Sequence, residues 1–401
     1  MSQSHSAVGA WHRPMVARLA GEEHRTATAL ELFFDLCFVA AVAQASAAFE
    51  HELAEGNVGH AVLGYAMVFF AIWWAWMNFT WFASAYDTDD VPYRLLTLVQ
   101  ITGALVVAAG AAEALGHEDF TVITWGYVVM RLAMVTQWLR AARSDPERRR
   151  SCLRYAAGIL VVQAGWVARL ALPEDWGLPT FAALVLAEIA VPVWAENAAM
   201  TTWHPHHIAE RYGLFTLIVL GETMTAATAA VRTALDGETA LGDILTLVIG
   251  GVLTVFALWW LYFAQNAPRK LTSLRSAILW GYGHYAVFAS AAAVGAGLAV
   301  NVAHSTGHGH LSDQAAAATF TVPVAVFITL VWLLHHRADE LRSRNDLIHP
   351  AAVLAVLAVL AVTFTPGPVL ATGLLSAALV AATLVVAARA QGGADPTRSA
   401  T

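Results

Sequence analysis

The feature that most restricts the fold of this chain is a series of apolar stretches of about 20 residues, the length that a helix needs to cross a bilayer. Only 13% of the residues are charged, against about 25% in a soluble domain. The sequence therefore predicts an all-α bundle of transmembrane helices with the lipid bilayer as its partner. We expect twelve spans, near residues 29–49, 60–83, 93–114, 120–141, 152–171, 178–198, 211–231, 241–264, 276–300, 315–336, 349–365 and 368–388.

The basic residues predict how the bundle is oriented. If the chain crosses the membrane twelve times, nearly all of its 22 lysines and arginines fall in loops on one side of the membrane. Short loops that carry Lys and Arg stay in the cytoplasm, so both termini are expected there. The opposite loops are acidic, as at Glu118, Asp119, Glu174 and Asp175.

The chain is expected to consist of two halves. A polar segment (1–25) precedes a first six-helix half (26–200) and a second one (201–390), and a disordered tail (391–401) follows. The first and seventh spans begin "ELFFDLCFVAAVAQ" and "ERYGLFTLIVLGET", and the second and eighth contain "WWAWMNF" and "WWLYF". These similarities favour two parallel repeats, as in transporters built from duplicated halves. The alternative is chance recurrence of tryptophan pairs in a chain that has 15 of them.

Ionisable residues inside the spans are the main candidates for function, because each costs about 2.5–3.5 kcal/mol on insertion scales and is kept where it faces a cavity or a partner. Glu31 and Asp35 are four residues apart and share one helix face. Such carboxylates suit a pathway for protons or for a substrate, and the alternative is a set of ion pairs that staples helices together. The candidates are Glu31, Asp35, Arg131, Glu188, Arg211, Glu222 and His284.

The charges at the middle of the membrane do not balance. Three deep acids, Asp35, Glu188 and Glu222, accompany one deep arginine, Arg131. Arg131 cannot lose its proton, so it must pair with an acid at its own depth, and we expect Glu222, with Glu188 as the alternative. At least one remaining acid must then hold a proton or reach water.

Two further groups are candidates for lining a pocket. Trp73, Trp74 and Trp76 lie too deep in their span for an interfacial belt and could hold an apolar or cationic ligand, although such residues more often pack. Gly221 and Thr223 lie in the middle of the seventh span and suit a close approach of ligand or of a neighbouring helix.

Other kinds of site have little support. The histidine-rich stretches at 204–207 and 304–310 contain metal-ligand residue types, but the two cysteines, at positions 37 and 152, form no thiolate set. We therefore expect solvated loops, no metal and no cofactor. The chain has no G-x-x-x-x-G-K nucleotide loop, and no nucleic acid partner is expected.

Five segments, in one order, resemble the bacterial low temperature requirement A (LtrA) family over roughly residues 25–340. They are "ELFFDLCFV", "DTDDVPYR", "VVMRLAMV", "HIAERYGLFTLIVLGET" and "GYGHY". The resemblance implies a multi-pass protein of the bacterial inner membrane. The family name records a link to growth in the cold and no biochemical activity.

The function expected from these observations is secondary transport or an ion pathway, with midplane carboxylates that couple to protons or to an unknown small substrate. One alternative is a membrane-embedded enzyme acting on a lipid or an isoprenoid, which would need acids such as Asp87–Asp90 and Glu31 to converge at one membrane face. Another is a structural membrane factor linked to growth in the cold. The twelve spans, the possible duplication and the midplane charges favour transport, and we assign no catalytic residues.

The predicted topology can be tested by cysteine labelling from outside intact cells. A cysteine in the 304–310 loop should be labelled, because this loop is expected outside the cell. A cysteine at residue 145 should not be labelled, because its loop is expected in the cytoplasm. Labelling at residue 145 would overturn the predicted number of spans.

Overall fold

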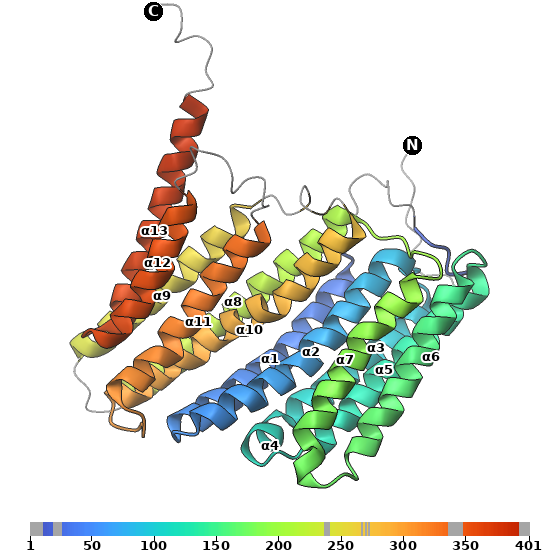
Figure 1. Cartoon of the computed structure of the whole chain (residues 1–401), viewed down its shortest axis with the longest axis horizontal. Coiled ribbons are helices and arrows are strands. Elements are labelled where there is room, and N and C mark those ends of the chain that lie inside the picture. The colour runs from blue at the N-terminus through green and yellow to red at the C-terminus, as the bar shows by residue number, and fades with distance from the viewer. Residues whose placement is uncertain are drawn as a thin grey trace, which may run out of the picture. The chain divides into compact units, whose positions relative to one another are not determined.

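The computed structural model describes residues 11–18, 26–235, 241–265, 268, 271, 273–335 and 348–392, and these residues are helical apart from short connections (Figure 1). The 3-10 turns are η1 (Glu174–Trp176) and η4 (Val362–Phe364). The α-helices are α1 (Ala29–Ala54), α2 (Val58–Tyr86), α3 (Val91–Ala109), α4 (Ala111–Gly116), α5 (Thr121–Ser144), α6 (Arg149–Arg169), α7 (Gly177–Glu196), α8 (Pro205–Leu235), α9 (Leu241–Phe263), α10 (Leu274–Ser305), α11 (Asp313–His335), α12 (Ile348–Ala361) and α13 (Pro368–Gly392).

Every predicted span coincides with a helix. Within the described residues, 11 helices are long and apolar enough to cross a membrane. The twelfth predicted span corresponds to α12 with η4, a shorter apolar segment from Pro350 to Phe364. The 14 residues of α12 reach only about 21 Å at the α-helical rise. The prediction of a multi-pass transmembrane bundle is confirmed.

The chain divides into two compact units, and each consists of more than one stretch of sequence. Unit 1 comprises Met1–Ala45 and Gly64–Phe215, and unit 2 comprises Ser46–Leu63 and Thr216–Thr401. Residues of α1, α2 and α8 therefore belong to both units. The predicted repeat of two six-helix halves stays a prediction, and the predicted tail lies outside the described residues from residue 393 onward.

Unit 1 is built by helices that pack in sequence order, α3 on α5, α5 on α6 and α6 on α7. Two features of the sequence fix the start of α3. Asp90 is the N-cap residue, and its carboxylate accepts a hydrogen bond from the Tyr93 N–H. A proline follows in the first turn of the helix. Gly103 and Gly126 allow α3 and α5 to touch: a Cβ added to Gly103 would lie 2.7 Å from the Gly126 carbonyl oxygen. Small residues permit this close crossing, as is common in membrane helices.

Unit 2 contains a second set of closely packed helices. α10 packs on α11, α9 packs on α13, and α12 contacts both α11 and α13. Asn301 on α10 is buried, and its amide donates hydrogen bonds to the carbonyl oxygens of Gly297 (2.7 Å) and Ala316 (2.8 Å). Because Ala316 belongs to α11, this amide joins the two helices, and a polar link of this kind is favoured where no water competes.

The glycine contact in unit 1 gives a stability prediction. Gly103→Ala should destabilise the protein by about 1–3 kcal/mol, because the added methyl group overlaps the α5 backbone. Gly221→Ala is the matched control, since Gly221 is also inside a helix but nothing lies within 4 Å of a Cβ built there. Thermal unfolding in detergent should show a loss for Gly103→Ala alone, and equal losses would contradict the predicted contact.

Candidate functional site

Two pairs of ionisable side chains face each other near the starts of α1 and α8. Glu31 and Asp35 lie on α1, and His207 and Arg211 lie on α8. Members of each pair are four residues apart and therefore share one helix face. All four side chains are fully buried. We call Glu31, Asp35, His207 and Arg211 the Arg211 cluster.

Arg211 holds both carboxylates of the Arg211 cluster. Its Nε donates to Asp35 Oδ2 at 3.0 Å and its Nη2 donates to Asp35 Oδ1, while its Nη1 lies 3.0 Å from Glu31 Oε1. His207 Nε2 lies 3.0 Å from the same Glu31 oxygen. The Trp76 indole N–H on α2 donates to Asp35 Oδ1 at 2.7 Å. Asp35 therefore lies beside α8, which contains the seventh predicted span, and Glu31 faces the same helix.

Counted over its own four members, the Arg211 cluster has a formal charge of −1 when His207 is neutral. Two ionised carboxylates accompany one guanidinium, and a guanidinium does not lose its proton in proteins. An uncompensated charge is expensive away from water. One added proton, on His207 or on a carboxylate, makes the cluster neutral. That proton belongs to the coupled group as a whole.

A second buried acid in unit 1 has a different environment. Glu188 on α7 accepts hydrogen bonds at Oε2 from Trp74 Nε1 (2.9 Å) and Arg131 Nη2 (2.7 Å). Its Oε1 accepts from the Tyr127 hydroxyl (3.0 Å) and from Trp166 Nε1 (3.3 Å). The five residues, which we call the Glu188 centre, come from α2, α5, α6 and α7. The four donors fill the acceptor capacity of an ionised carboxylate.

The Glu188 centre is balanced in charge, with one carboxylate and one guanidinium. The partner of Arg131 is Glu188, the alternative that the sequence allowed, and the first choice, Glu222, lies half-buried on α8 among the residues of unit 2. Arg131 Nε and Nη1 have no hydrogen-bond acceptor among the described residues. The paired charges and four donors are typical of a fixed ion pair that joins helices.

The tryptophans of α2 act as hydrogen-bond donors to the two acids. Trp74 and Trp76 are two residues apart, which turns their side chains by about 200° on an α-helix. Trp74 therefore reaches Glu188 and Trp76 reaches Asp35 from opposite sides of α2. Trp73 is also buried, with its ring centroid 5.5 Å from that of Trp74. Trp74 and Trp76 thus each make a specific polar contact, and their possible role in lining a pocket stays a prediction.

The remaining candidates lie in unit 2. His284 is fully buried, and its Nδ1 lies 2.7 Å from the Trp280 carbonyl oxygen, so Nδ1 carries the proton. His284 Nε2 then accepts from the Tyr262 hydroxyl at 3.0 Å. The Thr223 hydroxyl lies 3.0 Å from the Ala291 carbonyl of α10, which indicates helix packing. Gly221 is exposed and lines an apolar groove with other residues of α8 and α9.

The enzyme alternative, which needs the acids of "DTDD" and Glu31 at one membrane face, stays a prediction, and the three aspartates of "DTDD" form ion pairs. Each has its own arginine. Arg18 lies 3.7 Å from Asp87, Arg94 lies 2.7 Å from Asp89, and Arg140 lies 2.6 Å from Asp90. These ion pairs tie the N-terminal segment and the α2–α3 connection to the bundle.

Sequence reasoning did not identify His207 as part of the site, and it missed Tyr127 and Trp166. A signal for His207 existed: His207 and Arg211 repeat the spacing of Glu31 and Asp35. In the other histidine-rich stretch, His304 Nε2 lies 2.8 Å from Asp313 Oδ1. The described residues contain no group of three His, Cys, Asp or Glu side chains placed to hold a metal ion.

Comparisons with known proteins agree with the fold and leave the activity open. A family model described as "Bacterial low temperature requirement A protein (LtrA)" matches residues 26–388, which include the Arg211 cluster and the Glu188 centre. An uncharacterized protein of Rhizobium meliloti (strain 1021) is 28% identical over 255 residues, which are 60% of this chain and 58% of that protein. The chain thus spans about three-fifths of the length of the curated relative it matches. No solved structure matches the chain.

The Arg131–Glu188 pair can be tested by a double-variant cycle. Arg131→Leu alone should destabilise the protein by about 3–5 kcal/mol, because it leaves a buried acid without its counter-ion. Arg131→Leu with Glu188→Gln should recover part of this loss, since the unpaired charge is gone. Thermal unfolding of the purified variants measures both effects.

The matched control in this cycle is Arg131→Leu with Glu222→Gln. Its two effects should add, because Arg131 already has Glu188 as its partner. Recovery in this control, with none in the Glu188 double variant, would reverse the assignment of the partner.

Proposed function

Because this chain belongs to the bacterial low temperature requirement A (LtrA) family and crosses the membrane many times, we propose that it is a proton-coupled secondary transporter or ion pathway of the bacterial inner membrane. The observation that supports this function is the charge of the Arg211 cluster. Its fully buried members reach neutrality by binding one proton. Buried acids of this kind are used as proton relays in pumps and transporters.

Each residue of the cluster has a distinct role in this proposal. Arg211 keeps both carboxylates in place and cannot itself exchange a proton. His207 and Glu31 share the proton, because their facing atoms are 3.0 Å apart. Asp35 is held by Arg211 and by the Trp76 indole, so it serves as the fixed negative charge of the cluster.

Protons are proposed to reach the cluster from the cytoplasmic end of α1 and α8. Glu31 and His207 lie in the first turns of these helices, and Asp35 lies one turn deeper. The chain just before α1 is held at this end, where the Ala27 N–H donates to Glu210 Oε2 at 3.2 Å and the Thr28 N–H donates to Glu31 Oε2 at 2.8 Å. The residues that exchange the proton are therefore close to a helix end.

Proton binding is coupled to the conformation of the protein because a net charge on the cluster is costly in a closed interior. With the proton bound, the cluster is neutral and stable in a closed interior. When the proton leaves, a net negative charge remains, and it is stabilised only where water or a cation can reach it. Proton loss thus favours an open conformation and proton binding favours a closed one. A substrate carried with the proton shifts the same equilibrium through its different affinities for the two states.

Proton flux into proteoliposomes that contain a pH-sensitive dye tests the proposal. Under an imposed pH gradient, Glu31→Gln and His207→Gln should each lower the initial rate to the background of empty liposomes, because the exchangeable site is lost. Folding of both variants is checked by thermal unfolding and by gel filtration.

Glu196→Gln is the matched control for proton flux. Glu196 is a carboxylate of the same unit, but it is hydrogen-bonded to the neutral hydroxyls of Tyr155 and Thr201. This variant should keep the wild-type rate. Wild-type flux in folded Glu31→Gln and His207→Gln, or an equal loss in Glu196→Gln, would refute the role of the cluster.

A further inference from the structure

The stretch that joins α5 to α6 is strongly basic. Residues 140–154 contain two acids, Asp145 and Glu147. They also contain six arginines, which are Arg140, Arg143, Arg148, Arg149, Arg150 and Arg154. The Arg211 cluster and the Glu188 centre include none of these residues. A positively charged side of the membrane explains why arginines occur in such a loop, and the contacts within unit 1 show which of them lack a counter-ion.

The two acids of this stretch are both used by one arginine. Arg148 Nη1 lies 3.2 Å from Asp145 Oδ2 and 3.4 Å from Glu147 Oε2. Arg140 has its own partner on α3, since its Nη2 lies 2.6 Å from Asp90 Oδ2. The other four form no ion pair with a described residue, and they are Arg143, Arg149, Arg150 and Arg154. Four positive charges therefore remain without a counter-ion at this end of unit 1.

Arg150 and Arg154 begin a stripe along one face of α6. Residues 150, 154, 157 and 161 have the i, i+4, i+7, i+11 spacing of a single helix face. Ala157 is exposed, and Val161 has 71% of its surface exposed. Over about 16 Å of helix, this face changes from guanidinium groups to apolar side chains. Because α6 is a candidate span, the stripe has the same order of properties as a phospholipid, a charged head followed by hydrocarbon.

The Arg154 side chain is held in place at the polar end of this stripe. Its guanidinium carbon lies 5.2 Å from the centroid of the Trp194 ring, and its Nη1 donates to the Trp194 carbonyl oxygen at 2.9 Å. Trp194 is near the end of α7 with 47% of its surface exposed, as is typical of tryptophan at the membrane–water interface. A guanidinium that is already fixed at headgroup level loses less conformational freedom when it binds a phosphate.

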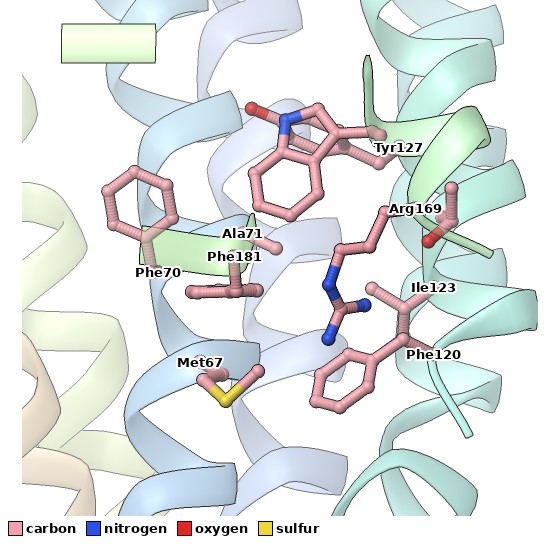
Figure 2. A pocket seen from close by; sticks show the side chains of 10 residues that line it. Met67, Phe70, Ala71, Phe120, Ile123, Tyr127, Arg169 and Phe181 are labelled. Atoms are coloured by element: carbon pink, nitrogen blue, oxygen red, sulfur yellow. The ribbon is translucent and has the colours of Figure 1, made fainter. Parts of the chain in front are cut away.

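Arg169, at the other end of α6, shows how an arginine is satisfied within unit 1. Its guanidinium carbon lies 5.1 Å from the centroid of the Phe120 ring and 5.6 Å from that of Phe181 (Figure 2). Its Nε donates to the Gly177 carbonyl oxygen at 3.1 Å. The cavity beside it has a volume of about 20 Å³, which is room for about one water molecule. Arg150, in the first turn of α6, is exposed and has no such partner among the described residues.

We propose that Arg149, Arg150 and Arg154 bind the phosphate of an anionic phospholipid, with an acyl chain along Ala157 and Val161. Guanidinium groups present parallel N–H donors that match phosphate oxygens. Arg149 and Arg150 lie in the first turn of α6, where the helix dipole disfavours a positive charge, and a bound phosphate removes this conflict. The unpaired arginines repel an ammonium group, so the site prefers phosphatidylglycerol to phosphatidylethanolamine.

Native mass spectrometry of the full chain in detergent tests the site, with phosphatidylglycerol and phosphatidylethanolamine of identical acyl chains. Wild type should retain phosphatidylglycerol more strongly. Arg150→Gln should lower its retention about fivefold, the ratio expected for one arginine near a lipid headgroup. Arg150→Lys should lower it less, because the charge is kept. Arg149→Gln should act like Arg150→Gln, and it serves as the test if gel filtration shows that Arg150→Gln does not fold.

Arg94→Gln is the matched control. Arg94 is an exposed arginine near the start of α3, and the Arg140–Asp90 ion pair joins the start of α3 to the end of α5. Its Nε and Nη2 donate to the two carboxylate oxygens of Asp89 at 2.7 and 2.9 Å. The control removes the same charge at the same end of unit 1, but this charge is already neutralised, so retention of phosphatidylglycerol should not change.

Four results would overturn the proposal. The first is equal retention of the two lipids by the wild type. The second is unchanged retention of phosphatidylglycerol in Arg150→Gln or, where that variant does not fold, in Arg149→Gln. The third is an equal loss in Arg94→Gln, which would indicate a general effect of surface charge. The fourth is displacement of the lipid by glycerophosphoglycerol at equal concentration, because the site would then recognise a soluble anion.

Discussion

Arg211 is a permanent positive charge in a buried part of a membrane protein, and unit 1 is arranged around that constraint. A guanidinium cannot become neutral, so carboxylates must be brought to it. Two acids one helical turn apart on α1 meet this need, and the i, i+4 spacing of His207 and Arg211 matches them on α8. The opposing pairs set the register between the start of α1 and the start of α8. A shift of either helix by one residue would turn the charged side chains by about 100° away from their partners.

The Glu188 centre and the Arg211 cluster stabilise buried acids in different ways. Glu188 has one counter-ion and four donors, so its ionised form is fully satisfied. The Arg211 cluster has two acids and one guanidinium, so its four members together are neutral when they hold one added proton. The first arrangement resists change and suits a structural role. The second changes its net charge when it gains or loses one proton, which is what the proposed proton exchange requires.

The sequence predicts the spans and the face that Glu31 and Asp35 share, because apolar length and helical spacing are local properties. It also places Arg131, Glu188 and Glu222 at similar depth. The expected partner of Arg131, Glu222, is wrong, because the sequence shows depth along a helix, whereas packing sets the direction of a side chain toward a particular neighbour. For the same reason Trp74 and Trp76 look like one aromatic stripe, although they contact different acids. The sequence does not single out His207, because this residue precedes the apolar stretch of its helix.

The contacts of α2 indicate which helices would move during proton exchange. Trp74 and Trp76 extend from opposite sides of α2, so rotating α2 to follow Asp35 would pull Trp74 away from Glu188. Glu188 is also bonded to α5 and α6, and these bonds hold α2, α5, α6 and α7 as one group. The Arg211 cluster contacts α2 through the Trp76 indole, which donates to Asp35, and through the Phe79 ring, whose centroid lies 5.9 Å from the Arg211 guanidinium carbon. A change in the charge of the cluster is therefore accommodated at lower cost by the starts of α1 and α8 than by α2.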